Sequence, residues 1–231
     1  MRLAIVLGAS IAGVAVLASL AGAARSPVIV VDPGHDAYAN LATEPIGPGS
    51  SFRKIKDGGG TRGVVSGLPE AALNLRVALR LRALLEGAGV RVVMTRTATE
   101  GTSMGRVHAA LFLRIHADGS VDPRTRGTHT LYPAFRNGWT DDIYAASKRA
   151  ATIVQSEEVR ALGFPDAGLQ ERTDYTGFNW SNVPAILVEM GFMTNPTEDR
   201  LLATAVYEQR AAVGLCRGTL RFLRRSDVRC G

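Results

Sequence analysis

The first apolar run of the folded part of the chain stops abruptly at a polar turn. Residues 28–31 are all β-branched, and Asp32, Pro33, Gly34 and His35 follow them. A short continuous apolar run bounded by turn residues is typical of a strand that is buried on both faces of a parallel sheet. The pattern therefore predicts a central strand that presents a carboxylate and an imidazole at its carboxyl end.

Two later stretches repeat this arrangement of an apolar run that ends in an ionisable residue. Residues 111–116 end in His116, and residues 185–189 end in Glu189. Ligands of open α/β sheets bind just outside the carboxyl ends of the strands. If these strands are neighbours, His35, His116 and Glu189 converge at one edge of the sheet. Two imidazoles and a carboxylate at that edge suggest a metal site with a general base.

Helical periodicity separates the predicted strands. Residues 68–86 carry apolar side chains at helical spacing, and two glycines follow as an end signal. Residues 90–95 read as the next strand and complete a strand–helix–strand unit. Further predicted elements are a short helical turn at 105–110, a strand at 127–133, a helix at 141–162 and a mostly helical segment at 197–225. This order predicts an α/β fold, a single domain with a twisted, mostly parallel sheet and helices on both faces.

Two polar segments are predicted to border the site. Residues 36–68 are long and rich in glycine, and they leave the strand that carries His35. A connection of this length without structure of its own is usually functional or mobile, so we expect it to rim the site. Residues 166–182 are polar and rich in turn-forming residues, and we expect them to form another wall of the cleft.

The first residues differ from the rest of the chain. Arg2 precedes an uncharged apolar stretch at 3–24, and residues 21–23 match the small-x-small cleavage pattern of a secretory signal. About 20 apolar residues can also span a bilayer, so an uncleaved anchor is the alternative. We expect residues 1–23 to be a signal peptide, because an anchor would press the first core strand against the headgroups. Residues 24–231 would then be one exported domain without a stable membrane span, in the periplasm, the cell wall or the extracellular space.

Export bears on the two cysteines, Cys216 and Cys230. In an oxidising compartment, a disulfide that closes the loop between them would stabilise the fold by about 3 kcal/mol on the chain-entropy model. Cys216 also falls on an apolar helical stripe, which is typical of a small core residue. The two interpretations are compatible, because a buried Cys216 can still hold the tail.

The chain is basic, with a formal net charge of +6. A basic exported protein favours anionic surfaces, among them bacterial wall polymers and membranes. The basic residues are not clustered with aromatic residues, so the sequence does not indicate a nucleic-acid site. An ordinary solvated basic surface explains the charge equally well.

Glu70 is a third candidate ligand, because it follows the segment that is expected to rim the site. A carboxylate in the first turn of a helix is also favoured by the helix dipole, which would explain Glu70 without a metal. The chain has no HExxH and no CxxC motif, so spacing alone leaves a metal at His35, Glu70 and His116 undecided. We expect His108 and His129 to be ordinary structural residues.

The sequence around these candidates resembles the zinc-dependent N-acetylmuramoyl-L-alanine amidases of the amidase-3 type. The matching segments are VVDPGHD, GLPEAALNLRVALRLRALLEGAGVRVVMTR, LFLRIHADG and VPAILVEMGFMTNPTED, in order from about residue 28 to about residue 223. The resemblance implies a cell-wall hydrolase, or autolysin, that cleaves the amide between N-acetylmuramic acid and L-alanine in peptidoglycan. The chain departs from the family pattern in a shortened segment before His116 and in Arg114, where a serine is common.

The resemblance also implies a role for each candidate. His35, Glu70 and His116 match the family's ligands for one Zn²⁺ per chain, and Glu189 matches its catalytic glutamate. Two imidazoles and one carboxylate leave a fourth position for water, which is typical of a catalytic zinc site. In that role Glu189 takes a proton from the water and passes it to the leaving amine.

Contacts with the muropeptide are expected from three further residues. Asp118 follows the strand of His116, and Arg172 and Asn179 lie in the polar segment at 166–182. Arg172 would pair with a carboxylate of the stem peptide, with a solvated loop charge as the alternative. For Asp118, a turn-capping role is as compatible with the sequence as a contact with substrate.

Two other functions fit parts of this pattern. A zinc peptidase that acts on the stem peptide would use identical metal chemistry. A non-catalytic wall-binding protein with the same fold would have no need of the intact set of His35, Glu70, His116 and Glu189. We therefore expect an enzyme whose partner is peptidoglycan, without nucleic acid, and which is a monomer.

Overall fold

A six-stranded sheet forms the centre of the molecule in the computed structural model, which describes residues 26–98, 108–136 and 138–230. The strand order is β4-β1-β5-β8-β6-β7. The strands are β1 (Val28–Pro33), β4 (Arg91–Met94), β5 (Leu111–Asp118), β6 (Thr128–Pro133), β7 (Asp166–Arg172) and β8 (Ala185–Phe192). Neighbouring strands are parallel except for β6 and β8, which are antiparallel. The predicted α/β fold with a mostly parallel sheet is confirmed.

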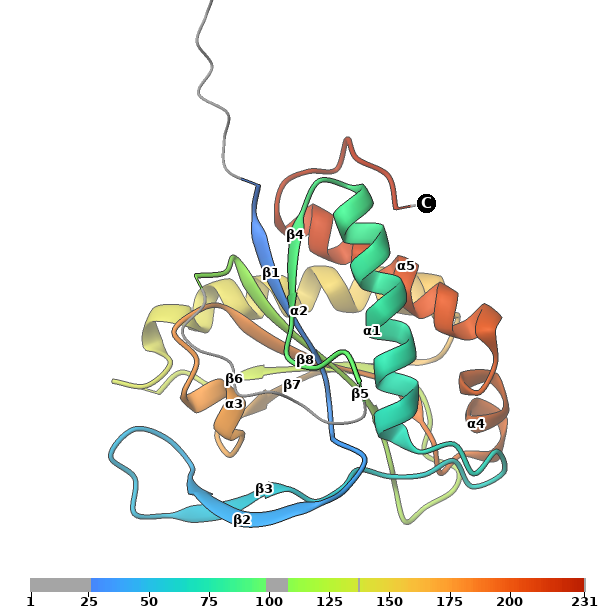
Figure 1. Ribbon diagram of the computed structural model, residues 1–231, viewed down its shortest axis with the longest axis horizontal. Helices are drawn as coiled ribbons and strands as arrows, with labels where there is room; N and C mark the ends of the chain where they lie inside the picture. Colours follow the sequence, from blue (N-terminus) through green and yellow to red (C-terminus); the bar gives the residue numbers. More distant parts are fainter. Residues whose placement is uncertain (1–25, 99–107, 137, 231) are drawn as a thin grey trace, which may run out of the picture.

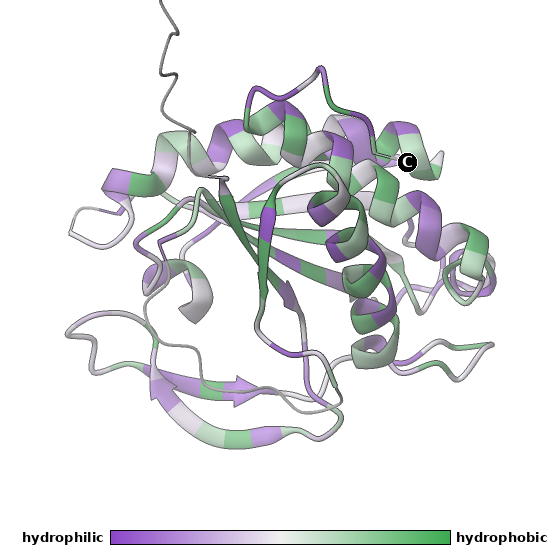
Figure 2. Cartoon of the chain, turned by 45° about the horizontal axis from the view of Figure 1, so that its top comes forward, coloured by the Kyte–Doolittle hydropathy of each residue, from purple (hydrophilic) through white to green (hydrophobic). Residues whose placement is uncertain are grey.

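Three long helices cover one face of the sheet (Figure 1). They are α1 (Glu70–Gly87), α2 (Asp141–Leu162) and α5 (Ala205–Phe222), and α5 packs against both of the others. Alternate residues of β5 are fully buried in the core beneath them, namely Leu111, Leu113 and Ile115. Figure 2 shows mostly hydrophobic residues in the central strands and a mixture of hydrophobic and hydrophilic residues in the helices. The removal of this apolar surface from water is the main force that holds the layers together.

The opposite face of the sheet carries the ionisable side chains of the central strands. Arg114 and His116 occupy the positions of β5 that alternate with its core residues. Glu189 pairs in register with His116 from the neighbouring strand β8. The short helix α3 (Thr176–Asn179) lies against part of this face, where Phe178 is fully buried in a small apolar cluster. The fold thus places the main core on one face and the polar residues on the other.

The segment 36–68 contains a β-hairpin, so the expectation that it has no structure of its own was wrong. Strands β2 (Asn40–Pro45) and β3 (Arg53–Asp57) pair antiparallel as a separate two-stranded sheet, which is drawn in blue and cyan in Figure 1. Most of their residues are exposed or only partly buried. Without a buried face, the hairpin lacks the alternation of apolar and polar residues that reveals a strand in the sequence.

The polar segment 166–182 also contains regular structure that the sequence concealed. Its first part is β7, and most residues of this edge strand are exposed. An exposed edge strand lacks the apolar run that marks a buried one. The remaining elements follow their predicted ranges, with α4 (Pro196–Leu202) and α5 in the segment predicted to be mostly helical. The first half of the helical turn expected at 105–110 lies outside the described residues, and 108–110 contain no helix.

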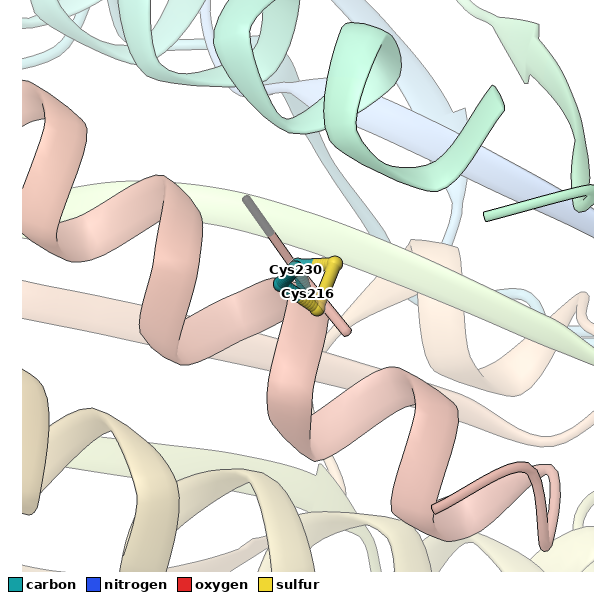
Figure 3. The surroundings of a disulfide bond; sticks show 2 residues. All are labelled: Cys216 and Cys230. Carbon is teal, nitrogen blue, oxygen red and sulfur yellow. A yellow bond between two sulfur atoms is a disulfide. The ribbon is translucent and has the colours of Figure 1, made fainter. Parts of the chain in front are cut away.

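A disulfide between Cys216 and Cys230 holds the C-terminal tail against α5 (Figure 3). Cys216 is fully buried in the main core, so it is both a core residue and a disulfide partner. The signal peptide expected at 1–23 lies outside the described residues. No helix of the described ranges has the length and apolar character that a membrane span needs.

Candidate active site

His35, Glu70 and His116 come from three elements and meet at the carboxyl ends of the central strands. His35 follows β1, Glu70 is the first residue of α1, and His116 lies near the end of β5. Nε2 of His35 is 3.4 Å from Oε2 of Glu70, and Nδ1 of His116 is 3.1 Å from Oε1 of the same carboxylate. One potential ligand atom from each residue lies within 4.8 Å of the others. The structure therefore brings together the three residues that the sequence selected as metal ligands.

The surroundings of His116 fit a bound cation. Its Nε2 is buried, and no described residue gives it a hydrogen bond. A buried polar atom without a partner is costly, so such an atom points to a missing ligand. A Cβ at Gly34 would lie 2.0 Å from this nitrogen and 2.1 Å from Cε1 of the same ring, so glycine leaves the room that the His116 imidazole occupies. Two imidazoles and a carboxylate are the donor set of a catalytic zinc site, and these residues fit that ion.

Asp57, at the end of β3, holds His35 in place. Its Oδ1 lies 2.5 Å from Nδ1 of His35, and its carboxylate accepts hydrogen bonds from the backbone N–H groups of Asp36 and Gly59. Burial alone raises the pKa of Asp57, but these backbone hydrogen bonds and His35 together hold the pKa below its usual value. The ionised carboxylate fixes the proton of His35 on Nδ1, which leaves the lone pair of Nε2 available to bind a metal.

Glu70 is buried and nevertheless ionised. Burial alone raises its pKa, but the hydrogen bond and charge of His116, the charge of His35 and the backbone N–H of Thr61 lower the pKa to about 2. Asn74, one turn along α1, donates from Nδ2 to Oε1 of Glu70 and to the carbonyl oxygen of Gly34, both at 3.1 Å. The carboxylate is thus fixed in orientation and in charge.

Arg96 fastens the turn of His35 to the start of α1. It is buried, and it donates hydrogen bonds to the carbonyl oxygens of Pro33 at 2.7 Å, Gly34 at 3.1 Å and Ala71 at 2.7 Å. His35 has a φ of 61°, a left-handed conformation that is uncommon for a residue other than glycine. A strained backbone conformation persists where surrounding contacts stabilise it, and here the hydrogen bonds of Arg96 to the turn before His35 do so.

Glu189 is a buried carboxyl beside this cluster. Its Oε2 has no hydrogen-bond partner in the described part of the chain. Burial raises the pKa of Glu189 well above its usual value, and the negative charges of Glu70 and Asp118 raise it further. A carboxyl with a raised pKa at the wall of a cavity is typical of a general acid or base.

A cavity of about 660 Å³ connects these residues. The three candidate ligands and Glu189 line it, together with residues of the hairpin and of the segment that leads into α3. Segment 36–68 therefore rims the site as expected. Asp118 also lines the cavity, and its Oδ1 accepts the backbone N–H of Gly119 at 2.6 Å. His129, on β6, stays outside the cluster, with Nε2 3.5 Å from Oδ2 of Asp118.

Arg172 and Asn179 are not among the described residues that line this cavity. Arg172 binds Asp174 through two nitrogens, at 2.9 and 2.7 Å. Asn179 is buried and donates to the carbonyl oxygens of Ile46 and Thr173, so it ties α3 to the loop of the hairpin. The predicted contacts of these two residues with substrate are therefore untested, and neither side chain lines the cavity that holds the candidate ligands.

Three residues that hold the site together were not predicted from the sequence, namely Asp57, Asn74 and Arg96. Asp57 lies just before Gly58-Gly59-Gly60, and this run of glycines was the feature of the sequence that could have drawn attention to it. Asn74 had a signal in its spacing, since it lies four residues after Glu70 on the same helix face. Nothing in the sequence pattern marks Arg96, because its role depends on three carbonyl groups that meet only in the folded chain.

A buried carboxyl with a raised pKa beside two imidazoles and a carboxylate is the combination of side chains that metallohydrolases use. The family model described as N-acetylmuramoyl-L-alanine amidase, Amidase_3, matches residues 29–221, and the chain belongs to this family.

Known relatives and solved structures agree with this assignment. The chain is 32% identical over 216 residues to the N-acetylmuramoyl-L-alanine amidase Rv3717 of Mycobacterium tuberculosis, over 85% of this chain and 86% of the relative. The crystal structure of the N-acetylmuramyl-L-alanine amidase Ami1 from Mycobacterium smegmatis matches with a TM-score of 0.75 and 27% identity, over 86% of this chain and 97% of the other. The N-acetylmuramoyl-L-alanine amidase from Clostridium difficile 630 matches with a TM-score of 0.68 and 27% identity, over 87% and 98%.

Proposed function

We propose that this protein hydrolyses the amide between the lactyl group of N-acetylmuramic acid and the L-alanine of the stem peptide in peptidoglycan. In this proposal His35, Glu70 and His116 bind one zinc ion, and Glu189 is the general acid–base. The observation that carries the proposal is the position of Glu189, which pairs in register with His116 and whose buried Oε2 has no hydrogen-bond partner among the described residues. Membership of the amidase family supports the choice of substrate.

The side chains of the site divide the chemistry among them. A zinc ion bound here would polarise the scissile carbonyl group and lower the pKa of its bound water to about 7. Glu189 accepts the proton of the attacking water and later donates it to the nitrogen of the leaving L-alanine. A positive charge nearby favours the ionised form of a carboxyl, so a loaded site brings the raised pKa of Glu189 down and makes it a base.

The residues around the ligands keep this geometry fixed while the proton moves. Asp57 holds the proton of His35 on Nδ1, and Asn74 orients the carboxylate of Glu70. The low pKa of Glu70 keeps it ionised, so Glu189 is the carboxyl that exchanges the proton. Two carboxyl groups whose environments push their pKa values apart are typical of a site with separate roles for each.

Digestion of purified muropeptides tests this function. The products are read by mass spectrometry, with and without a chelator. The proposed cleavage releases a free lactyl carboxyl group and a free L-alanine amine, and the chelator abolishes it. Cleavage inside the stem peptide would make the protein a zinc peptidase. Binding of zinc and muropeptide without any cleavage would make it a wall-binding protein.

We also infer that residues 1–23 direct export, so that the protein acts in the periplasm, the cell wall or the extracellular space. The apolar stretch at 3–24 supports this, and so does the disulfide between Cys216 and Cys230, since disulfides persist in oxidising compartments. N-terminal sequencing of the exported protein tests the inference. A mature chain that begins at residue 24 agrees with it, and a chain that keeps residues 1–23 in the membrane contradicts it.

A further inference from the structure

Arg114 lies beside the candidate ligands on the polar face of the sheet. It is two residues before His116 on β5, so the two side chains emerge on the same face. Arg114 lines the cavity of about 660 Å³ and also an adjoining cavity of about 350 Å³. His35, Lys56, Asp57 and His116 likewise line both cavities. The two spaces therefore meet at the ligand cluster, with two cationic side chains at their junction.

The described residues bind only one side of the Arg114 guanidinium. Its Nε donates to Oδ2 of Asp32 at 2.7 Å, and Oδ1 of Asp32 accepts the hydroxyl of Thr95 at 2.5 Å. Within the described ranges, neither Nη1 nor Nη2 of Arg114 has a hydrogen-bond partner. Two parallel N–H groups of this kind are the edge with which arginine binds a carboxylate through two hydrogen bonds.

Two neighbours hold the guanidinium at this place. The ring of Phe112, two residues earlier on β5, lies 5.8 Å from Cζ of Arg114. Gly177, in α3, leaves the room that Nη1 occupies, since a Cβ there would lie 2.8 Å from that nitrogen. Gly177 does not adopt a left-handed φ, so what its lack of a side chain provides is space for the arginine.

Lys56 faces the same junction from the hairpin. It lies on β3 next to Asp57, it is exposed, and the described residues give it no ion pair. The acidic groups of the adjoining cavity each have a basic partner: Asp32 binds Arg114, Asp57 binds His35, and Asp36 lies 3.9 Å from Nε of Arg96. A carboxylate that entered the junction would therefore meet the free edge of Arg114 and the ammonium group of Lys56.

We propose that Arg114 and Lys56 form a subsite for a carboxylate of the substrate's peptide, next to the bond that is cleaved. This subsite rests on the proposed function for its substrate, an acidic peptide linked to a muramoyl group. Its consequence is specificity, because a substrate with a free carboxylate binds better than the same molecule with that group amidated. Arginine distinguishes the two, since an amide has one acceptor oxygen and no charge.

Binding of two matched probes tests the subsite. The probes are N-acetylmuramoyl-L-alanyl-D-glutamate and its amide, N-acetylmuramoyl-L-alanyl-D-isoglutamine. Calorimetry on the zinc-loaded Glu189→Gln protein measures the ratio of their dissociation constants without turnover. We expect Arg114→Gln to lower the preference for the acid about tenfold, as the loss of a charge-assisted hydrogen bond would. Gly177→Ala, which displaces Nη1, lowers the preference in the same direction.

Two further variants complete the test. Lys56 lies on the exposed hairpin, so we expect Lys56→Met to fold and to lower the preference for the acid. This variant tests the subsite even if Arg114→Gln fails to fold. Arg160→Gln is the matched control, because Arg160 also binds a single carboxylate, that of Glu157 at 2.8 Å, but lies far along α2. It leaves the preference unchanged. An equal preference in the parent and in both Arg114→Gln and Lys56→Met overturns the subsite.

Hydrolysis of the same probes by the protein with its native Glu189 separates this proposal from the proposed function. If the native protein releases L-alanyl-D-glutamate but Arg114→Gln does not change the preference for the acid probe over its amide, the subsite is rejected and the amidase function stands. A binding preference that falls in Arg114→Gln, without release of that dipeptide by the native protein, rejects the amidase and keeps the subsite.

Discussion

Oδ1 of Asp57 lies 2.5 Å from Nδ1 of His35, so a residue of the hairpin orients the imidazole at the end of the first core strand. The two residues are 22 positions apart, and the hairpin shares no strand pairing with the central sheet. The hairpin therefore forms part of the site, because it fixes which nitrogen of His35 is free. Outer partners of this kind determine the basicity and the orientation of metal-binding histidines.

Asp57→Asn should weaken zinc binding about 10- to 100-fold, because the variant loses the charge that fixes the tautomer of His35. Competition with a chromogenic chelator measures the affinity. Asp122→Asn is the control, since Asp122 lies in an exposed turn where it binds Arg124. Zinc affinity that is equal in the Asp57 and Asp122 variants would contradict the role of the hairpin.

Gly34→Ala should abolish zinc binding while the protein still folds. The new Cβ would lie 2.0 Å from Nε2 and 2.1 Å from Cε1 of His116, so the imidazole would be displaced from its place beside Glu70. Gly87→Ala is the matched control, because nothing lies within 4 Å of a Cβ at the end of α1. Metal analysis and circular dichroism of both variants test this. Full zinc content in Gly34→Ala would contradict the assignment of the His116 imidazole as a ligand.

Cys230→Ser should lower the free energy of unfolding by about 3 kcal/mol and leave zinc content unchanged. The disulfide closes a loop of 14 positions at the C-terminal tail, and neither cysteine lines the cavity of the site. Urea unfolding and metal analysis measure the two quantities. A loss of zinc in Cys230→Ser would mean that the tail supports the site and not only the core.

The contribution of Glu158 to the free energy of unfolding should fall as pH rises above the usual pKa of this residue. Glu158→Gln should remove this contribution to the pH dependence. The side chain is fully buried in α2, neither carboxyl oxygen has a partner among the described residues, and burial raises its pKa well above 4.5. Between the unfolded and the folded pKa the folded state binds more protons, so the free energy of unfolding decreases with rising pH.

Thermal unfolding at pH 4 and at pH 7.5 measures this effect. We expect Glu158→Gln to match the parent protein at pH 4 and to exceed its Tm at pH 7.5. Glu86→Gln, at an exposed position of α1, serves as the control. A difference between Glu158→Gln and the parent that is the same at both pH values would contradict the buried ionisation.

The sequence revealed the parts of the fold that are buried and concealed the parts that are exposed. The strands β1, β5 and β8 were visible because burial on both faces demands continuous apolar runs. The hairpin and β7 were not, because exposed strands make no such demand on side chains.

The candidate site follows the same division. His35, His116 and Glu189 were found because each ends an apolar strand, and parallel strands bring their ends to one edge. Asp57 was missed because its partner lies across the hairpin, a contact that no local pattern encodes. Arg114 was noted as a departure from the family, but its free edge became visible only beside Asp32 and Gly177.

The most direct test of the account is the Glu189→Gln variant, measured for zinc content and for muropeptide hydrolysis in the same preparation. Glutamine keeps the shape and hydrogen-bonding capacity of the side chain but cannot accept the proton. We expect the variant to fold, to keep one zinc per chain and to bind muropeptide, while hydrolysis falls about 10²–10⁴-fold. Loss of zinc would make Glu189 a ligand, and near-normal hydrolysis with zinc retained would contradict its role as the general base.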